Sequence, residues 1–285
     1  VFLILEISML LGLSLTALLI PLRIPLHVPL LVQVLVWILV PLFFVLYYAF
    51  RDDVTGQLTF GNFKTFFTTP VNLKVAGRSL MIAALSTILC LLIAYPVAYI
   101  IAKSKIKNKS AILLVFIVPM WVNFVLRINA LKELLSWMGL INKSAGWDIF
   151  NTVLGMVYDF LPFMILPIYT TILKIDKSYP EAARDLGANN AKVFLRVTLP
   201  LSKPGILSGI SMVFLPSMTN YVVSNWMTNN KVTIIGGFID FAFLNDSWGR
   251  GSVTAIILLV LMFLFTWLTG GFKDEDGAAK GKALW

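Results

Sequence analysis

One carboxylate, Asp159, is the only acidic residue inside the six long apolar runs that make up most of this sequence. An ionised carboxyl group is costly to place in a hydrocarbon layer, so such a group usually faces a water-filled cavity or a charged partner. Two interpretations therefore remain open. Asp159 lines a route through the membrane, or it forms a structural ion pair with a basic side chain such as Arg127.

Residues that carry enzymatic or metal chemistry are scarce. The 285 residues include one cysteine, Cys90, and one histidine, His27, so neither a disulfide within the chain nor a His/Cys metal cluster is expected. We find no Ser/His/Asp, Cys/His or paired-carboxylate pattern and no G-x-x-x-x-G-K-[ST] phosphate-binding loop. We expect no catalytic residue, no metal site, no cofactor and no nucleotide site on this chain.

The elements that must position Asp159 are membrane helices. Hydrophobic residues make up 59% of the chain and charged residues only 13%, whereas a soluble domain carries about 25% charge. Six runs are long enough to cross about 30 Å of hydrocarbon as helices. They are Val28–Phe50, Ser79–Ala102, Ala111–Leu126, Thr152–Leu173, Gly205–Val222 and Ser252–Thr269. The composition predicts an all-α, multi-pass membrane protein.

The rest of the chain divides around this six-span domain, residues 28–270. Residues 1–27 form a further apolar segment, either an extra span or an interfacial helix, and lack the basic start of a signal peptide. The turn at 103–109, with four lysines, the loop 174–203 and the tail 271–285 are basic, which places them in the cytoplasm. Because membrane orientation explains the net charge of +9, we expect no nucleic-acid binding.

Proline recurs inside four of the predicted spans. Each proline removes a backbone donor and bends its helix. In a bilayer such breaks persist where neighbouring protein or a water-filled cavity satisfies the freed carbonyls. Either the helices surround a pathway, or these prolines are tolerated as they commonly are in membrane helices. The residues are Pro96, Pro119, Pro162, Pro167 and Pro216.

The loop 174–203 is long, charged and patterned to fold. Ser178 followed by Glu181 has the spacing of a capping box, and Gly187 can end the helix in a left-handed turn. Asn189 or Asn190 then caps a second short helix, which runs through Val197 and ends at Pro200. The small apolar face made by Ala182, Ala183 and Leu186 indicates a surface that another molecule approaches closely.

At these residues the sequence resembles a known family. Glu181-Ala182-Ala183, then Gly187, then Val197-x-Leu199-Pro200 resembles the EAA motif of ABC importer permeases, with valine where isoleucine is usual. The resemblance implies that the short helix docks in a groove of an ATPase subunit and transmits its closure to the membrane helices. The implied coupling residues are Glu181, Ala182, Ala183, Asp185, Gly187, Leu199 and Pro200.

Longer stretches extend the resemblance over roughly residues 28–270. The runs CLLIAYPVAY, VPMWVNFVLRI, LPFMILPIY and EAARDLGA resemble spermidine/putrescine permeases of the PotB type. This resemblance implies a six-helix type I importer core. It also implies a homologous second permease subunit, two ATPase subunits that bind ATP with Mg²⁺, and an extracytoplasmic polyamine-binding protein as partners. The inner membrane of a bacterium is the implied location.

A polyamine route needs carboxylates, carbonyls or aromatic faces to replace the hydration of several ammonium groups. We place Asp159 seven residues into the fourth span, about 10 Å from its outer end at 1.5 Å per residue. One carboxylate cannot balance several ammonium groups, so we expect the second permease to supply others. A lone Trp or Tyr near a membrane end is also typical of an interface belt. The candidate pathway residues are Asp159, Trp121, Asn123, Tyr158, Asn220 and Tyr221.

Other functions remain as alternatives. The chain could be an ABC permease for ferric iron, an amino acid or sulfate, although a carboxylate in the pathway argues against an oxyanion. A secondary transporter commonly shows internal repeats and several ionisable groups within the membrane. We find no convincing repeat, and that function would leave the patterned loop 174–203 unexplained.

Overall fold

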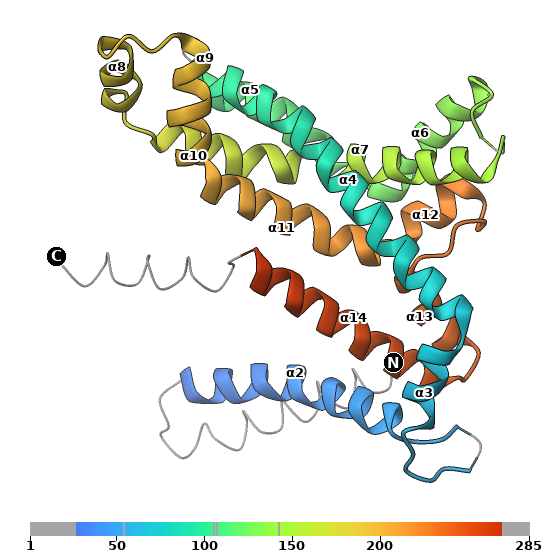
Figure 1. The fold of residues 1–285 in the computed structure, drawn as a ribbon. Coiled ribbons are helices and arrows are strands. Elements are labelled where there is room, and N and C mark those ends of the chain that lie inside the picture. The colour runs from blue at the N-terminus through green and yellow to red at the C-terminus, as the bar shows by residue number, and fades with distance from the viewer. Residues whose placement is uncertain (1–26, 54, 105, 107, 142, 270–285) are drawn as a thin grey trace. The chain divides into compact units, whose positions relative to one another are not determined.

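The computed structural model (Figure 1) describes residues 27–53, 55–104, 106, 108–141 and 143–269, and these residues form helices and no strand. The expected N-terminal segment, up to residue 26, and the tail 271–285 lie outside them. The elements are α2 (His27–Ala49), α3 (Gly61–Thr68), α4 (Pro70–Lys103), α5 (Lys109–Ile117), η2 (Val118–Trp121), α6 (Phe124–Trp137), α7 (Ala145–Lys174), α8 (Ser178–Asp185), α9 (Asn190–Val193), η3 (Phe194–Thr198), α10 (Leu199–Leu201), α11 (Lys203–Thr219), α12 (Tyr221–Thr228), α13 (Ile235–Leu244) and α14 (Trp248–Leu268).

The chain divides into two compact units. Unit 1 contains the described residues up to Asn72 together with Ile239–Leu259, and unit 2 contains Leu73–Phe238 and the residues from Val260 onward. Unit 2 therefore holds both the loop that resembles the EAA motif and Asp159.

In unit 1, two polar side chains fix the chain that follows α2. Asn62 of α3 donates from Nδ2 to the carbonyl oxygens of Ala49, at 3.2 Å, and Arg51, at 2.8 Å. The backbone N–H of Gly249, at the start of α14, donates to Asp53 Oδ1 at 2.8 Å. The last carbonyls of α2 and the first N–H groups of α14 are thus satisfied within the same unit.

In unit 2, α7 forms the centre of the core, and α11 and α12 pack along it. Met164 and Ile168 of α7 are fully buried. Two glycines of α11 allow a close approach, since a Cβ on Gly205 would lie 2.6 Å from the carbonyl oxygen of Pro167. A Cβ on Gly209 would lie 2.6 Å from Met164 Sδ. Small residues at such a contact let two membrane helices pack backbone to backbone.

The described residues contain three helices that are long and apolar enough to cross a bilayer, α4, α7 and α14. The number rises to five if each of two bent pairs counts as one span. The first predicted span corresponds to α2, a helix of 23 residues. Four of the six predicted spans correspond to single helices, whereas the third is interrupted before Phe124 and the fifth, Gly205–Val222, at Asn220 between α11 and α12. The bounds also differ: α7 begins at Ala145, seven residues before the predicted start at Thr152.

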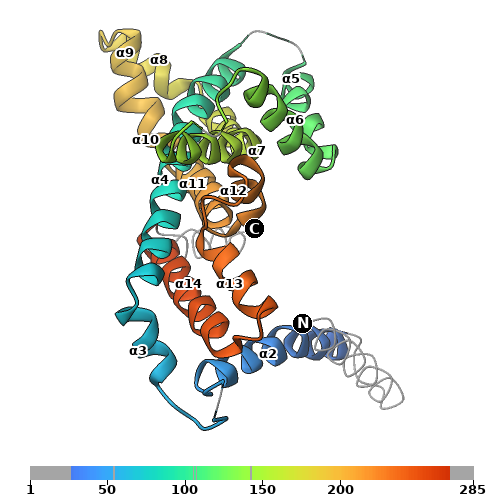
Figure 2. The same ribbon diagram turned by 90° about the vertical axis from the view of Figure 1, so that its right-hand side faces the viewer.

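The third predicted span, Ala111–Leu126, is not one straight helix. Its first part, α5, ends at Ile117, and Phe124 begins α6 after a bend of 92° (Figure 2). Pro119 lies in the short 3₁₀ turn between them, where its missing N–H favours a break. The Asn123 side chain then accepts from the Val125 N–H at 2.9 Å and caps the new helix.

Candidate functional site

The patterned loop forms two short helical segments around a glycine turn, at one end of unit 2 (Figure 1). Gly187 has φ +80°, the left-handed conformation predicted for it. Its N–H donates to the Arg184 carbonyl at 2.8 Å, and the Ala188 N–H donates to the Ala183 carbonyl at 3.0 Å. These two bonds satisfy the last carbonyls of α8, so the turn is held by the backbone and needs a residue without a Cβ.

The start of α8 differs from the predicted capping box. The Ser178 hydroxyl makes no capping bond to Glu181, because the helix begins one residue earlier than a Ser178 cap requires. The carboxylate of Asp176 accepts from the Ser178 N–H at 2.9 Å, and this bond lowers the pKa of Asp176. At the second segment the prediction is confirmed for Asn189, whose side chain accepts from the Lys192 N–H at 2.9 Å.

The second segment is longer and less regular than predicted. It passes from α9 into a π-helical turn, Phe194–Thr198, and continues through α10 to Leu201. Pro200 therefore does not end it; the proline occupies the first turn of α10, where no N–H is needed. The chain then bends by 62° into α11 at Ser202. Two of the implied coupling residues, Leu199 and Pro200, lie directly before this bend.

Aromatic and hydroxyl groups of α4 hold this bend. The Phe194 ring meets the rings of Tyr95 and Tyr99 edge to face, with centroids 5.7 and 5.3 Å apart. Tyr95 and Ser202, both buried, share a hydrogen bond of 2.9 Å between their hydroxyls. None of these residues was predicted from the sequence to have a functional role. The i, i+4 spacing of Tyr95 and Tyr99 was a visible signal, since it places both rings on one face of a helix.

The outer surface of the loop is open. Leu186 is 89% exposed, and Glu181, Ala182 and Asp185 are exposed as well. A cavity of about 270 Å³ lies between the two helical segments and is lined by Ala183, Leu186 and Gly187, among others. An apolar, small-residue surface of this kind fits a protein partner.

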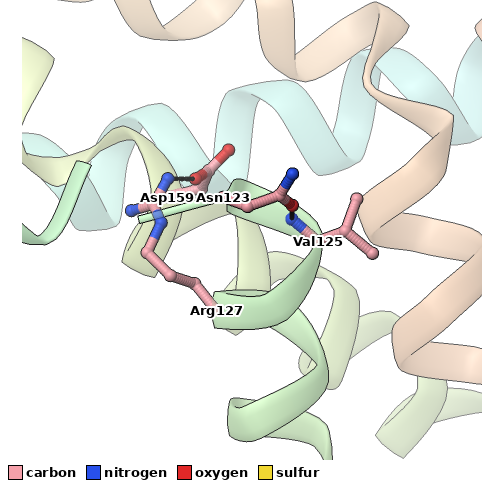
Figure 3. Close-up of polar contacts among 4 residues, drawn as sticks. All are labelled: Asn123, Val125, Arg127 and Asp159. Carbon is pink, nitrogen blue, oxygen red and sulfur yellow. Dashed lines mark hydrogen bonds and ion pairs between the residues drawn. The ribbon is translucent and has the colours of Figure 1, made fainter. Parts of the chain in front are cut away.

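Asp159 pairs with Arg127, the alternative that the sequence left open (Figure 3). Arg127 Nη2 lies 2.6 Å from Asp159 Oδ1, and both side chains are only 9% exposed. The contact uses one guanidinium nitrogen, and the buried Nε of Arg127 has no hydrogen-bond partner. The pair thus joins α6 to α7 through a single hydrogen bond between charged groups, whereas an arginine can donate two parallel hydrogen bonds to one carboxylate.

Asp159 also lies further along its helix than predicted. It follows Ala145, the first residue of α7, by fourteen positions in a helix of 30 residues, which is about 21 Å at 1.5 Å per residue. The longer helix includes a second acid, Asp148, which the predicted bounds had left out. Asp148 is 4% exposed, its Oδ1 has no hydrogen-bond partner, and it borders a cavity of about 390 Å³ that Arg78 also lines.

The structure brings only one other predicted pathway residue to the pair. Tyr158 is 41% exposed, and the Arg127 guanidinium lies over its ring at 5.9 Å. Asn123 is occupied as the cap of α6, and Trp121 is 79% exposed in the turn before it.

The remaining two predicted pathway residues lie at the break between α11 and α12. Asn220 separates these helices, and Tyr221 begins α12. A Cβ on Gly237 would lie 3.1 Å from the Tyr221 Cβ. The described residues contain no group of three or more His, Cys, Asp or Glu arranged to hold a metal ion.

Comparison with known proteins identifies the chain's relatives. It is 38% identical over 231 residues to the spermidine/putrescine transport system permease protein PotB of Haemophilus influenzae, an alignment that covers 76% of this chain and 78% of that protein. The PotB protein of Escherichia coli is also 38% identical, over 230 residues, with 75% and 83% covered.

Solved structures support the fold. A bacterial ABC transporter chain involved in the import of the acidic polysaccharide alginate matches with a TM-score of 0.66 at 16% identity, over 87% of this chain and 93% of that chain. The same kind of transporter, in complex with an alginate pentasaccharide-bound periplasmic protein, matches with a TM-score of 0.67 at 15% identity, over 88% and 93%. The shared architecture is that of an ABC importer permease.

A family model matches residues 94–273, which include α7, Asp159 and the whole EAA-like loop. Its family is described as the binding-protein-dependent transport system inner membrane component. The match spans more than half of the chain and agrees with the helical fold and with the relatives, which are transport permeases and not enzymes. The chain therefore belongs to the family of inner membrane components of binding-protein-dependent transport systems.

Proposed function

We propose that the chain is the permease subunit of an ATP-driven polyamine importer and forms half of the route for spermidine or putrescine. The observation that carries the proposal is the 38% identity to proteins named spermidine/putrescine permeases, over about three quarters of this chain. The likeness to alginate transporters, at 15–16% identity, supports the fold without bearing on the substrate.

The proposed assembly contains a homologous second permease, two ATPase subunits and an extracytoplasmic polyamine-binding protein. The exposed face of α8, with Ala182 and Leu186, would dock on an ATPase subunit. Docking covers apolar surface that the chain alone leaves in water, which favours the complex. The coupling residues are those of the motif: Glu181, Ala182, Ala183, Asp185, Gly187, Leu199 and Pro200.

For the route itself we propose the face around Asp159 and Tyr158. An ammonium group is attracted both to a carboxylate and to the face of an aromatic ring. Arg127 already neutralises Asp159, so a passing ammonium must compete with the guanidinium for the carboxylate. The contact through one guanidinium nitrogen makes that exchange less costly than a two-bond pair would. Trp121, Asn123, Asn220 and Tyr221 remain proposed pathway residues whose role depends on the second permease.

Transport by the reconstituted importer tests this function. The chain, assembled with its own partner subunits in proteoliposomes, is expected to accumulate labelled spermidine or putrescine only when ATP and the binding protein are supplied. Excess sulfate, ferric iron or amino acid should leave the uptake unchanged. ATP-dependent uptake of one of these solutes, without uptake of a polyamine, would show that the substrate assignment is wrong while leaving the family intact.

A further inference from the structure

A cavity of about 630 Å³ lies behind the coupling loop in unit 2, where the ends of α4, α5 and α7 meet α8. Four basic residues from two stretches of the sequence line it: Lys103 ends α4, Lys109 begins α5, Lys177 precedes α8 and Arg184 lies in the last turn of α8. Two stretches distant in sequence thus bring their positive charges to one opening. In the sequence these residues indicated only the orientation of the chain.

The described residues that line this cavity do not balance its positive charge. Glu181 is the only carboxylate that lines it, against four cations. The ion pair that joins Arg127 to Asp159 lies outside this cavity. Lys109 donates to the Ala102 carbonyl at 2.6 Å, and Arg184 donates to the Asn190 side chain at 3.5 Å, so both use neutral acceptors. The like charges of Arg184, Lys109 and Lys177 also repel the charge of Lys103. An anion entering the cavity relieves this repulsion.

The position of the cavity indicates which anion it takes. It lies at the ends of membrane helices, on the side that the basic loops assign to the cytoplasm, and this is the depth of phospholipid headgroups. One wall is apolar, formed by Ile172, Leu173 and Val193 among others. A lipid presents a phosphate and an apolar glycerol and acyl region together, which suits a basic cavity with an apolar wall. A free phosphate ion would use only the basic part.

We propose that this cavity binds the phosphate group of an anionic phospholipid through Lys103, Lys109, Lys177 and Arg184. The site joins the ends of α4, α5 and α7 to the coupling helix α8 through one ligand. It does not depend on the identity of the transported solute, so its test and that of the proposed function fail separately.

Binding of phosphatidylglycerol to the purified full chain in a nonionic detergent tests the site by native mass spectrometry. Phosphatidylcholine with the same acyl chains is the zwitterionic comparison. Near an anionic lipid surface each basic residue strengthens binding by about 1 kcal/mol, which corresponds to about a fivefold change in affinity. We therefore expect the double variant Lys103→Gln/Arg184→Gln to bind phosphatidylglycerol about 25-fold more weakly. The variant Lys174→Gln/Lys203→Gln is the matched control, since it removes the same charge from exposed residues that do not line the cavity.

Each outcome decides between the alternatives. Loss in the cavity variant with retention in the control supports the site. The single variant Lys177→Gln changes an exposed residue and should bind phosphatidylglycerol about fivefold more weakly. It provides the test if the double variant does not fold. Equal binding of both lipids, or equal loss in cavity and control variants, overturns the site. Displacement of the lipid by excess inorganic phosphate would assign the cavity to a free phosphate and overturn the lipid. Normal lipid binding by a cavity variant that no longer retains the ATPase subunit would assign it to protein docking instead.

Discussion

Neutralising Asp159 should destabilise the chain more than neutralising Arg127, although the two residues share one bond. The contact of 2.6 Å joins side chains that are both 9% exposed. Breaking a buried pair from one side strands a charge and costs about 3–5 kcal/mol. After Arg127→Gln the remaining carboxyl group can bind a proton and become neutral, whereas after Asp159→Asn the guanidinium cannot lose its charge.

The double variant Asp159→Asn/Arg127→Gln replaces the ion pair by two amides that can still hydrogen-bond, so it should recover most of the loss. Thermal unfolding of the purified chain measures the series. At roughly 2–4 °C per kcal/mol for a chain of this size class, Asp159→Asn should lower the midpoint by about 6 °C or more. Lys132→Gln is the control. It also removes a cation from α6, but the hydrogen bond that Lys132 donates to Asn229 is exposed.

The result also separates a structural pair from a pathway residue. If Asp159 only holds α6 to α7, the double variant restores both the unfolding midpoint and polyamine uptake per assembled complex. If the carboxylate receives the substrate, the double variant restores the midpoint while uptake stays low. An unchanged midpoint in Asp159→Asn, or a double variant as unstable as the sum of the two single variants, would refute the account of the ion pair.

Two further predictions concern glycines with matched controls. Gly205→Ala should lower the free energy of unfolding by about 1–3 kcal/mol, because its Cβ meets a backbone carbonyl of α7 that cannot move aside. Gly77→Ala is the control, because nothing lies within 4 Å of its Cβ and the free energy of unfolding should not fall. Gly187→Asp should abolish ATP-driven uptake without preventing membrane insertion. Gly139→Asp is the control. Gly187 has φ +80° and Gly139 has φ +67°, and nothing lies within 4 Å of a Cβ at either position, so the two substitutions should cause similar backbone strain. Gly139 lies outside the coupling loop, so the Gly139→Asp variant should transport normally. Equal uptake in the last two variants would contradict the docking role of the loop.

The sequence predicted the helical class and the helix–turn–helix geometry of the loop 174–203 because both depend on local signals. Apolar runs are read directly from composition, and Gly187 followed by Asn189 marks a helix end and a helix start. The loop is also the place where residue identity is most constrained by backbone geometry: a left-handed turn favours glycine, and a helix cap favours asparagine. These predictions were confirmed by φ at Gly187 and by the side-chain bond of Asn189.

The predictions that failed depend on tertiary structure. In a helix that is apolar on every side, periodicity shows neither which face is buried nor where the helix bends. The break at Pro119 and Asn123 was readable as a helix stop and start, but an uninterrupted apolar run favoured one span across it. The start of α7 was placed too late because polar residues such as Asp148 and Asn151 were assigned to a loop; in the fold they are buried within the helix.

The packing of unit 2 explains how a movement at the coupling loop would reach Asp159. A displacement of α8 acts on the bend at Ser202, which is bonded to Tyr95 and held by the Phe194 ring. Beyond the bend, α11 lies against α7 at Gly205 without room for a Cβ, so the two helices cannot slide past one another freely. Because α7 carries Asp159, a displacement of α11 changes the position of the carboxylate relative to Arg127 on α6. The single bond of that pair is therefore the contact in unit 2 that we expect to respond first when an ATPase subunit moves the loop.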